Sequence, residues 1–330
     1  MNVMNNIMLE RYKEVNCTPS MDSGRYLVWF QVTMITLNAV AFAIISVGIV
    51  SNILIMITIT KFLKKSIPYQ LMVWIAINDN FRLYADMFDF VFHLLELFKE
   101  NIPIYYMKPL SIGHAIDMVF EAFGSNASKY ILTQLTILQY ISISRPFFIP
   151  QSFMINLIAA VITLVNLLIV IPHYYLFQIQ YCASQGKFML IANFNLIWYY
   201  RAYAESFLHP ICSLVAVIFV SILMIRAIRK SNRLRIEMKS ETLNITRSVL
   251  KLNLIFVICN IPYLFDCALL GFSYSGKFSV VTRNIIIYFA DLCTCINSSV
   301  RFMIYMLSDK RFKHSFKKIF HMNGSEIKLL

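Results

Sequence analysis

Long runs of apolar residues without a single charge are the main feature of this sequence. Asp, Glu, Lys and Arg are all absent from positions 26–60, 146–186 and 206–225. A helix needs about 20 apolar residues to cross the hydrocarbon core of a bilayer, and each of these runs is long enough to hold one. The charge pattern alone therefore predicts three transmembrane helices.

Further apolar segments complete a bundle, although its second, third and seventh spans carry ionisable residues. Charged side chains are costly against lipid, so we expect these faces to turn toward the bundle interior. The predicted fold class is an all-α membrane protein, a seven-transmembrane helix bundle with a short amphipathic helix 8 after it. The seven spans are predicted at residues 26–60, 69–98, 110–144, 155–177, 197–228, 246–270 and 283–307.

Composition supports one membrane domain at residues 26–307, between an extracellular amino-terminal segment 1–25 and a cytoplasmic tail 308–330. Hydrophobic residues make up 58% of the chain and charged residues 14%, and the mean hydropathy is +0.64, well above that of a water-soluble protein. The first 22 residues include Glu10, Arg11, Lys13 and Glu14 and contain no apolar core, unlike a cleaved signal peptide. We expect the first span to act as its own insertion signal.

The distribution of Lys and Arg predicts the orientation. The segments after the odd-numbered spans carry 18 of the 30 Lys and Arg residues, whereas the amino terminus and the opposite segments carry nine. Because cytoplasmic segments are enriched in these residues, we predict an extracellular amino terminus in the plasma membrane. Asn16 is then a usable glycosylation acceptor, whereas the sequons at Asn126 and Asn244 lie within a span and on the cytoplasmic side. The net charge of +13 fits anionic inner-leaflet lipids and a cytoplasmic partner better than nucleic acid.

Short motifs occur in a fixed order along these spans. Residues 48–52 are Gly-Ile-Val-Ser-Asn, residues 75–79 are Ile-Ala-Ile-Asn-Asp, and residues 259–262 are Cys-Asn-Ile-Pro. Together with Arg145-Pro146 after the third span and Tyr305 late in the seventh, they resemble the landmarks of rhodopsin-like (class A) G-protein-coupled receptors. The resemblance gives switch or structural roles to Asn52, Asp79, Gln139, Tyr140, Pro210, Pro262, Asn297, Arg301 and Tyr305.

The chain departs from the family pattern at several switch positions. Gln139 stands where the family has the arginine that contacts the G protein, and Asn260 replaces the tryptophan two residues before Pro262. Arg301-Phe302 stands in place of the Asn-Pro of the seventh helix. With these departures, the chain resembles nematode chemosensory serpentine receptors and FMRFamide-type neuropeptide receptors more than amine receptors.

A further departure concerns the extracellular disulfide of the family. His114 stands where the family has a cysteine at the outer end of the third helix. The resemblance therefore leaves Cys182 without its usual partner, and Cys17 is the alternative.

The resemblance implies a receptor that converts binding of an extracellular ligand, a chemosensory molecule or a neuropeptide, into activation of a heterotrimeric G protein. Pro262 is expected to kink the sixth helix, which would move about this point. Phe312, Phe316 and Phe320 are spaced by four among basic residues. That spacing predicts an amphipathic helix on the inner leaflet.

Ionisable residues within the spans are the candidates for chemistry. The resemblance brings Asp79 and Arg301 together, and we expect a buried ion pair because an isolated charge at that depth is costly. Internal pairing competes with ligand binding, since Arg82 precedes Asp86 by one turn and Lys129 lies two turns from Glu121. The ligand-binding candidates in an outward-facing cavity are Glu121, Asp117, Asp86, Asp291 and Tyr263.

No enzyme is predicted. The sequence contains no nucleophile–base pair, no phosphate-binding glycine loop and no metal-ligand spacing, so we expect no cofactor and no metal. A membrane transporter or a ligand-gated channel is the alternative, because intramembrane charges also mark ion pathways. Transporters often show internal repeats, which are absent between the halves of this chain. An insect-type odorant channel would have its amino terminus inside, against the charge distribution.

Overall fold

The computed structural model describes residues 24–63, 66–97, 104–145, 151–170, 177–182, 187–192, 209–233, 240–273 and 280–326, which are nearly all helical. Helices suit these apolar segments because a helix satisfies its own backbone N–H and C=O groups, for which lipid offers no partners. The elements are α2 (Gly24–Phe62), α3 (Ile67–Leu97), α4 (Ile104–Ser144), α5 (Ser152–Val170), β1 (Phe177–Cys182), β2 (Lys187–Ala192), α7 (His209–Arg233), α8 (Ser240–Ser273), α9 (Val280–Ser299), α10 (Arg301–Ser308) and α11 (Lys310–Glu326).

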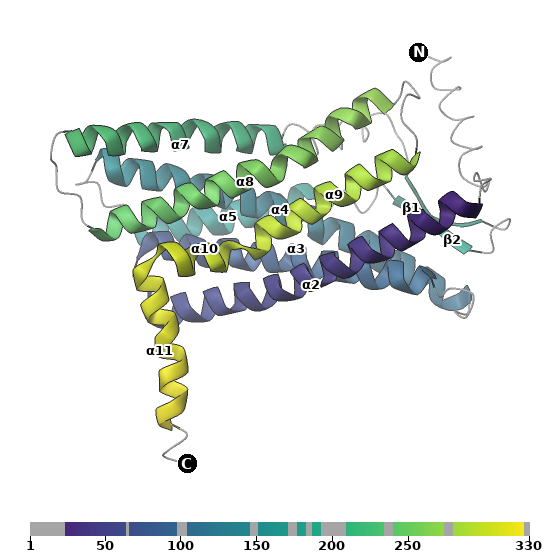
Figure 1. Cartoon of the computed structure of the whole chain (residues 1–330), viewed down its shortest axis with the longest axis horizontal. Coiled ribbons are helices and arrows are strands. Elements are labelled where there is room, and N and C mark those ends of the chain that lie inside the picture. Colours follow the sequence, from purple (N-terminus) through teal and green to yellow (C-terminus); the bar gives the residue numbers. More distant parts are fainter. Residues whose placement is uncertain are drawn as a thin grey trace.

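The long helices run side by side (Figure 1), and their contacts close into a ring. α3 packs against α2, α4 and α5, and α4 also contacts α7 and α8. α8 contacts α7 and α9, and α9 returns to α2, which closes the ring. α11 leaves the bundle and runs across the direction of the other helices.

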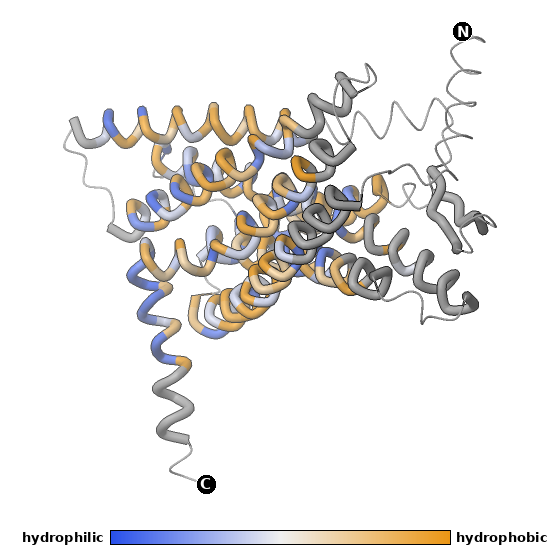
Figure 2. Tube along the Cα trace, turned by 45° about the vertical axis from the view of Figure 1, so that its right-hand side comes forward, coloured by the Kyte–Doolittle hydropathy of each residue, from blue (hydrophilic) through white to orange (hydrophobic). Residues whose placement is uncertain are grey.

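The outside of the bundle is apolar. Within the described residues, four segments are long and apolar enough to cross a membrane: Thr36–Phe62, Ser152–Val170, Pro210–Ser231 and Thr242–Phe265. Large apolar side chains point outward from these segments, and apolar residues follow the helices along the middle of the bundle (Figure 2). A surface of this kind is suited to lipid, so the chain has the construction of a membrane protein.

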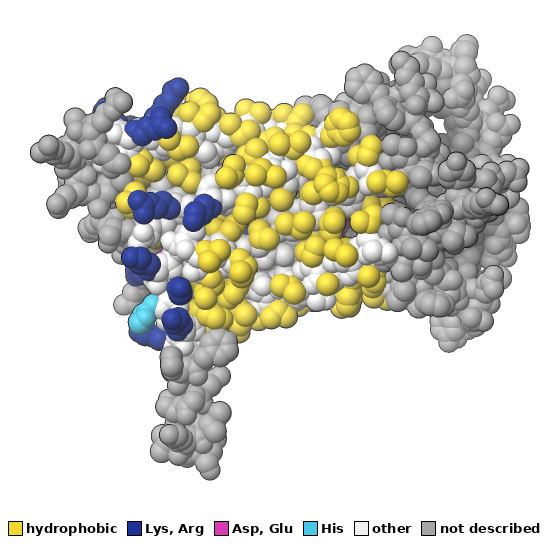
Figure 3. Space-filling model, viewed as in Figure 1, with side chains coloured by type: hydrophobic (Ala, Val, Ile, Leu, Met, Phe, Trp, Pro, Cys, Tyr) yellow, Lys and Arg dark blue, Asp and Glu magenta, His cyan; other side chains and the backbone are white. Residues whose placement is uncertain are grey.

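Basic side chains gather at the end of the bundle from which α11 leaves. Figure 3 shows Lys and Arg side chains at this end and hydrophobic side chains over the middle. We call this end the basic end. The exposed Lys and Arg residues there are Lys61, Arg145, Arg226, Arg229, Lys230, Arg247, Lys251, Lys310, Arg311, Lys313, Lys317 and Lys318.

A β-hairpin interrupts the otherwise helical chain. β1 pairs antiparallel with β2, with Tyr181 opposite Phe188. The prediction that the fourth span continues to residue 177 is wrong, because α5 ends at Val170 and Phe177 begins β1. Pro172 gives a reason in the sequence, since a proline disfavours the helical conformation of the residue before it. The predicted all-α class therefore holds for the bundle, and the hairpin is an addition to it.

The predicted seventh span is divided in two. α9 ends at Ser299, and α10 begins at Arg301 after a turn at Val300. The third helix begins at Ile104, six residues earlier than predicted, whereas the predicted start of the fifth span lies outside the described residues.

α3 and α4 touch backbone to backbone at Gly124. A Cβ atom at Gly124 would lie 2.5 Å from the carbonyl oxygen of Asn78 and 2.7 Å from the backbone nitrogen of Arg82. Small residues allow such close approach between membrane helices. The contact holds α4 against the stretch of α3 that carries the charged residues.

Candidate functional site

Asp79 and Arg301 form an ion pair inside the bundle. Arg301 Nη1 lies 2.8 Å from Asp79 Oδ2, and the two side chains are 4% and 1% exposed, respectively. Ser128 on α4 donates a 2.7 Å hydrogen bond to Asp79 Oδ1. The predicted contact is therefore present, and it joins α3 to the first residue of α10.

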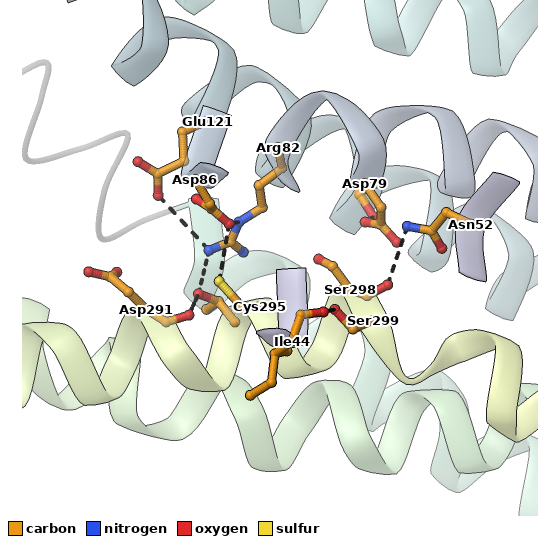
Figure 4. A network of polar contacts seen from close by, with 12 residues as sticks. Ile44, Asn52, Asp79, Arg82, Asp86, Glu121, Asp291, Cys295, Ser298 and Ser299 are labelled. Atoms are coloured by element: carbon orange, nitrogen blue, oxygen red, sulfur yellow. Dashed lines mark hydrogen bonds and ion pairs between the residues drawn. The ribbon is translucent and has the colours of Figure 1, made fainter. Parts of the chain in front are cut away.

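Two hydrogen bonds hold α2 against the end of α9, next to the break between α9 and α10. Asn52 Nδ2 donates to the carbonyl oxygen of Ser298 over 3.4 Å, and Ser299 Oγ donates to the carbonyl oxygen of Ile44 over 3.1 Å (Figure 4). The turn at Val300 lies directly between these serines and Arg301. Its position is thus fixed by side chains on both sides.

A second group of charges surrounds Arg82, one turn along α3. Arg82 Nε lies 3.5 Å from Asp86 Oδ2, Arg82 Nη2 lies 3.9 Å from Glu121 Oε1, and the guanidinium donates to the hydroxyl of Thr294. Cys295 Sγ donates to Asp86 Oδ2 over 3.1 Å. We call Arg82, Asp86, Glu121, Thr294 and Cys295 the Arg82 cluster, which joins α3, α4 and α9 (Figure 4).

The Arg82 cluster places two of the predicted ligand-binding carboxylates in internal contacts. The Asp86 side chain is 12% exposed beside Arg82, whereas the Glu121 side chain is 43% exposed. Glu121 is therefore the carboxylate with more access from outside. Figure 4 shows Asp291 near this group, on the same helix as Cys295.

Tyr263 lies beside a buried cation. Lys129 Nζ is 5.1 Å from the centroid of the Tyr263 ring, and the lysine is buried in the bundle. An ammonium group over an aromatic ring is stabilised by the ring quadrupole. Tyr263 therefore joins α8 to α4 through this contact.

Toward the basic end, neutral polar contacts replace the charges. Thr246 Oγ1 on α8 lies 3.3 Å from Oε1 of the buried Gln139 and also donates to its own helix, to the carbonyl oxygen of Thr242, over 2.7 Å. Thr136 Oγ1 donates to Asn253 Oδ1 over 3.1 Å, and Asn253 Nδ2 donates to Ser221 Oγ over 2.9 Å. α4, α7 and α8 are thus connected by side chains on this side of Pro262.

Sequence reasoning missed Thr136, Asn253 and Ser221, as well as the attachment of α11. Tyr69 donates a 2.6 Å hydrogen bond to Asp309 Oδ2, while Asp309 Oδ1 accepts from the backbone N–H groups of Arg311 and Phe312. Polar residues within apolar runs were the available signal. The sequence does not indicate with which residue on another helix each of these polar residues forms its hydrogen bond.

The remaining predicted residues have varied positions. Tyr305 and Asn297 are buried, and the Tyr305 ring lies 5.5 Å from that of Phe312. Pro210 is buried near the start of α7, Pro262 lies inside α8, and Tyr140 is half-buried. Outside the described part of the chain lie Asn16 and Cys17 and the side chains of Asp117 and Cys182.

Among the described residues, no group of three or more His, Cys, Asp or Glu side chains is arranged to hold a metal ion. What the arrangement offers is a set of buried charges and hydroxyls that fix helices to one another. No protein-family model and no curated protein sequence matches the chain.

Proposed function

We propose that this chain is a rhodopsin-like G-protein-coupled receptor with seven spans, an extracellular amino terminus and a cytoplasmic carboxyl terminus in the plasma membrane. The observation that carries the proposal is the closed ring of long helices with α11 leaving across it at the basic end. In this proposal, α9 and α10 together form the seventh span. The motif resemblance described above adds independent support.

The basic end would face the cytoplasm. Lys and Arg side chains are exposed at this end on α2, α7, α8 and α11, and at Arg145 directly after α4. Cytoplasmic connections carry such residues, and anionic inner-leaflet lipids attract them. α11 would then lie along the inner leaflet, with Phe312 turned into the bundle and basic residues outside.

Signalling would proceed by a shift between two arrangements of the bundle. A ligand that binds the active arrangement more tightly than the inactive one increases the population of the active arrangement. The ligand site can therefore lie far from the cytoplasmic end of the bundle. Movement of α8 about Pro262 would open its inner half away from α4 and α7 and expose a crevice for a helix of the G protein. Because Gln139 replaces the family arginine, its contact with Thr246 is neutral.

The ligand would bind at the end of the bundle opposite α11. Of the candidate carboxylates, Glu121 combines contact with Arg82 and an exposed side chain. A chemosensory molecule or a neuropeptide would therefore act on the Arg82 cluster from outside. Asp291 and Tyr263 lie on the neighbouring helices α9 and α8 and belong to the same proposed region.

A membrane transporter or a ligand-gated channel is the second candidate. The observation that favours it is the succession of buried charges, Asp79, Arg82 and Arg301, in the interior. Intramembrane charges of this kind also serve ion and proton pathways. Catalysis forms no part of either proposal.

Two measurements test the function. Antibody access to an epitope at Met1 in unpermeabilised cells, with no access to an epitope after Leu330, is the expected topology. A ligand screen in receptor-expressing cells, read out by calcium and cyclic nucleotide, is then expected to give responses that disappear when G-protein coupling is blocked. Ligand-evoked currents that persist without G proteins would establish a channel instead, and substrate flux would establish a transporter.

A further inference from the structure

Asn253 connects three helices through its single amide group. The side chain is buried, and its Nδ2 donates to Ser221 on α7 over 2.9 Å. Its Oδ1 lies 3.1 Å from the Thr136 hydroxyl on α4, whose proton is shared with the carbonyl oxygen of Leu132 at 2.8 Å. Leu132, Leu135, Met224 and Phe256 form part of the surrounding apolar core. In such surroundings, a polar group that loses its partners is strongly disfavoured. We call Thr136, Asn253 and Ser221 the Asn253 latch.

The latch lies on the part of α8 that would move. Asn253 precedes Pro262 by nine residues, which is about 13 Å along a helix. Rotation of the inner half of α8 by only about 10 degrees would carry Asn253 roughly 2 Å away, and hydrogen bonds of about 3 Å do not survive that extension. The latch is therefore incompatible with an open crevice.

A second contact lies on the same face of α8, nearer the basic end. Thr246 precedes Asn253 by seven residues, two helical turns. Its hydroxyl donates to the carbonyl oxygen of Thr242 over 2.7 Å and also lies 3.3 Å from Gln139 Oε1. Thr136 and Gln139 are one turn apart on α4. The two contacts thus align along one seam between α4 and α8, but only Asn253 also reaches α7.

We propose that Asn253 is the positioning residue that holds the inner half of α8 against α4 and α7, and that its amide must release both hydroxyls before the crevice opens. The inference rests on the proposed function in one respect, that a G protein is the partner that enters the crevice. The opening itself is a property of the bundle and is measurable without a G protein.

The test is the distance between the inner ends of α4 and α8. Spin-label amino acids are incorporated at positions 144 and 247, both exposed, and the distance distribution is measured by electron spin resonance in lipid nanodiscs. Asn253→Leu keeps the branched shape of the side chain and removes both hydrogen bonds. Ser221→Ala removes one bond of Asn253, and Thr136→Val removes the other together with the bond of the Thr136 hydroxyl to Leu132 on its own helix. A variant therefore remains if Asn253→Leu does not fold.

The matched control is Ser248→Ala. Ser248 is also buried on α8, but its hydroxyl donates to the carbonyl oxygen of Asn244 on the same helix, over 3.1 Å. Loss of this hydroxyl removes a buried hydrogen bond without releasing another helix. The distance distribution of Ser248→Ala is expected to match that of the unmodified chain.

Each latch variant is expected to raise the longer-distance population several-fold, and Thr136→Val is expected to add nothing to Asn253→Leu. Unchanged distances in folded Thr136→Val and Ser221→Ala, or an equal change in Ser248→Ala, would overturn the inference. If the latch variants open the bundle but no G protein responds in cells, the inference stands and the proposed function fails. If ligands activate a G protein while the latch variants keep the closed distances, the inference fails alone.

Discussion

Tyr69 and Asp309 attach α11 to the bundle: the Tyr69 hydroxyl donates to Asp309 Oδ2 over 2.6 Å, at the first turn of α3. The other carboxylate oxygen of Asp309 accepts from two backbone N–H groups at the start of α11. One side chain therefore caps α11 and fixes it to α3. The direction in which α11 leaves depends on this pair.

Replacing Asp309 is expected to loosen α11 more than replacing Tyr69. Asp309→Ala removes the cap and the hydrogen bond to Tyr69, and loss of a helix cap costs about 1 kcal/mol, which is roughly a fivefold increase in opening. Tyr69→Phe leaves the cap in place. Hydrogen exchange of backbone amides in α11 measures both effects, with the exposed Lys313→Gln as the control. Equal exchange in Asp309→Ala and the unmodified chain would contradict the role of the cap.

The Asp79–Arg301 pair is expected to dominate the stability of the bundle interior. Asp79→Asn leaves the Arg301 charge buried without its counter-ion, which costs about 3–5 kcal/mol. Adding Arg301→Gln removes that charge and is expected to recover part of the loss. Thermal unfolding in detergent and surface expression measure this double-mutant cycle. Arg247→Gln, an exposed change on α8, serves as the control and is expected to stay within about 0.5 kcal/mol.

Additive losses from Asp79→Asn and Arg301→Gln would mean that the two charges are not coupled. If both single variants kept full surface expression and full signalling, the pair would have neither a structural nor a switching role.

Gly124→Ala is expected to push α3 and α4 apart. The added Cβ meets backbone atoms of Asn78 and Arg82, which cannot rotate away, so we expect overpacking to cost about 1–3 kcal/mol. Gly113→Ala is the matched control, because its Cβ meets only the end of the Phe88 ring, at 2.7 Å, and that side chain can move. Thermal unfolding of the two variants is the measurement. An equal effect of both would show that backbone contact at Gly124 is unimportant.

The basic face of α11 is expected to bind anionic lipid. Each Lys near an anionic surface contributes about 1 kcal/mol, so Lys317→Gln with Lys318→Gln is expected to weaken the association of α11 with a bilayer that contains phosphatidylserine. A fluorophore on α11 in nanodiscs reports the association. Bilayers of phosphatidylcholine alone and high salt are the controls, since both remove the attraction. An effect independent of lipid charge would exclude this role.

Much of the bundle could be predicted from the sequence, because a charge-free run has a length that lipid thickness fixes. The contact between Asp79 and Arg301 could also be expected, because the motif resemblance brings the two positions together and an isolated charge at that depth is costly. The roles in ligand binding and signalling assigned to Glu121, Asp291 and the switch residues stay predictions.

Other features had no comparable signal. The turn at Val300 has no proline, and the hydroxyl and carbonyl contacts of Ser298 and Ser299 with α2 become visible only once the helices are side by side. Asn253 stands out as an amide in an apolar run, but its partners are 117 and 32 residues away along the chain. From the sequence alone, many Ser and Thr residues could equally well be the hydrogen-bond partners of Asn253.

Two of the charged residues on α3, Arg82 and Asp79, limit how α9 and α10 can move. Arg82 is attached to α9 through Thr294, and Asp79 is attached to α10 through Arg301, with Val300 between the two attachments. A slide of one helical turn along the membrane normal, about 5 Å, would break both at once. A change of the angle between α9 and α10 at Val300 breaks neither contact, because α9 and α10 are each attached to α3 by a separate contact. The freedom left to this part of the molecule is bending in place rather than travel along its length.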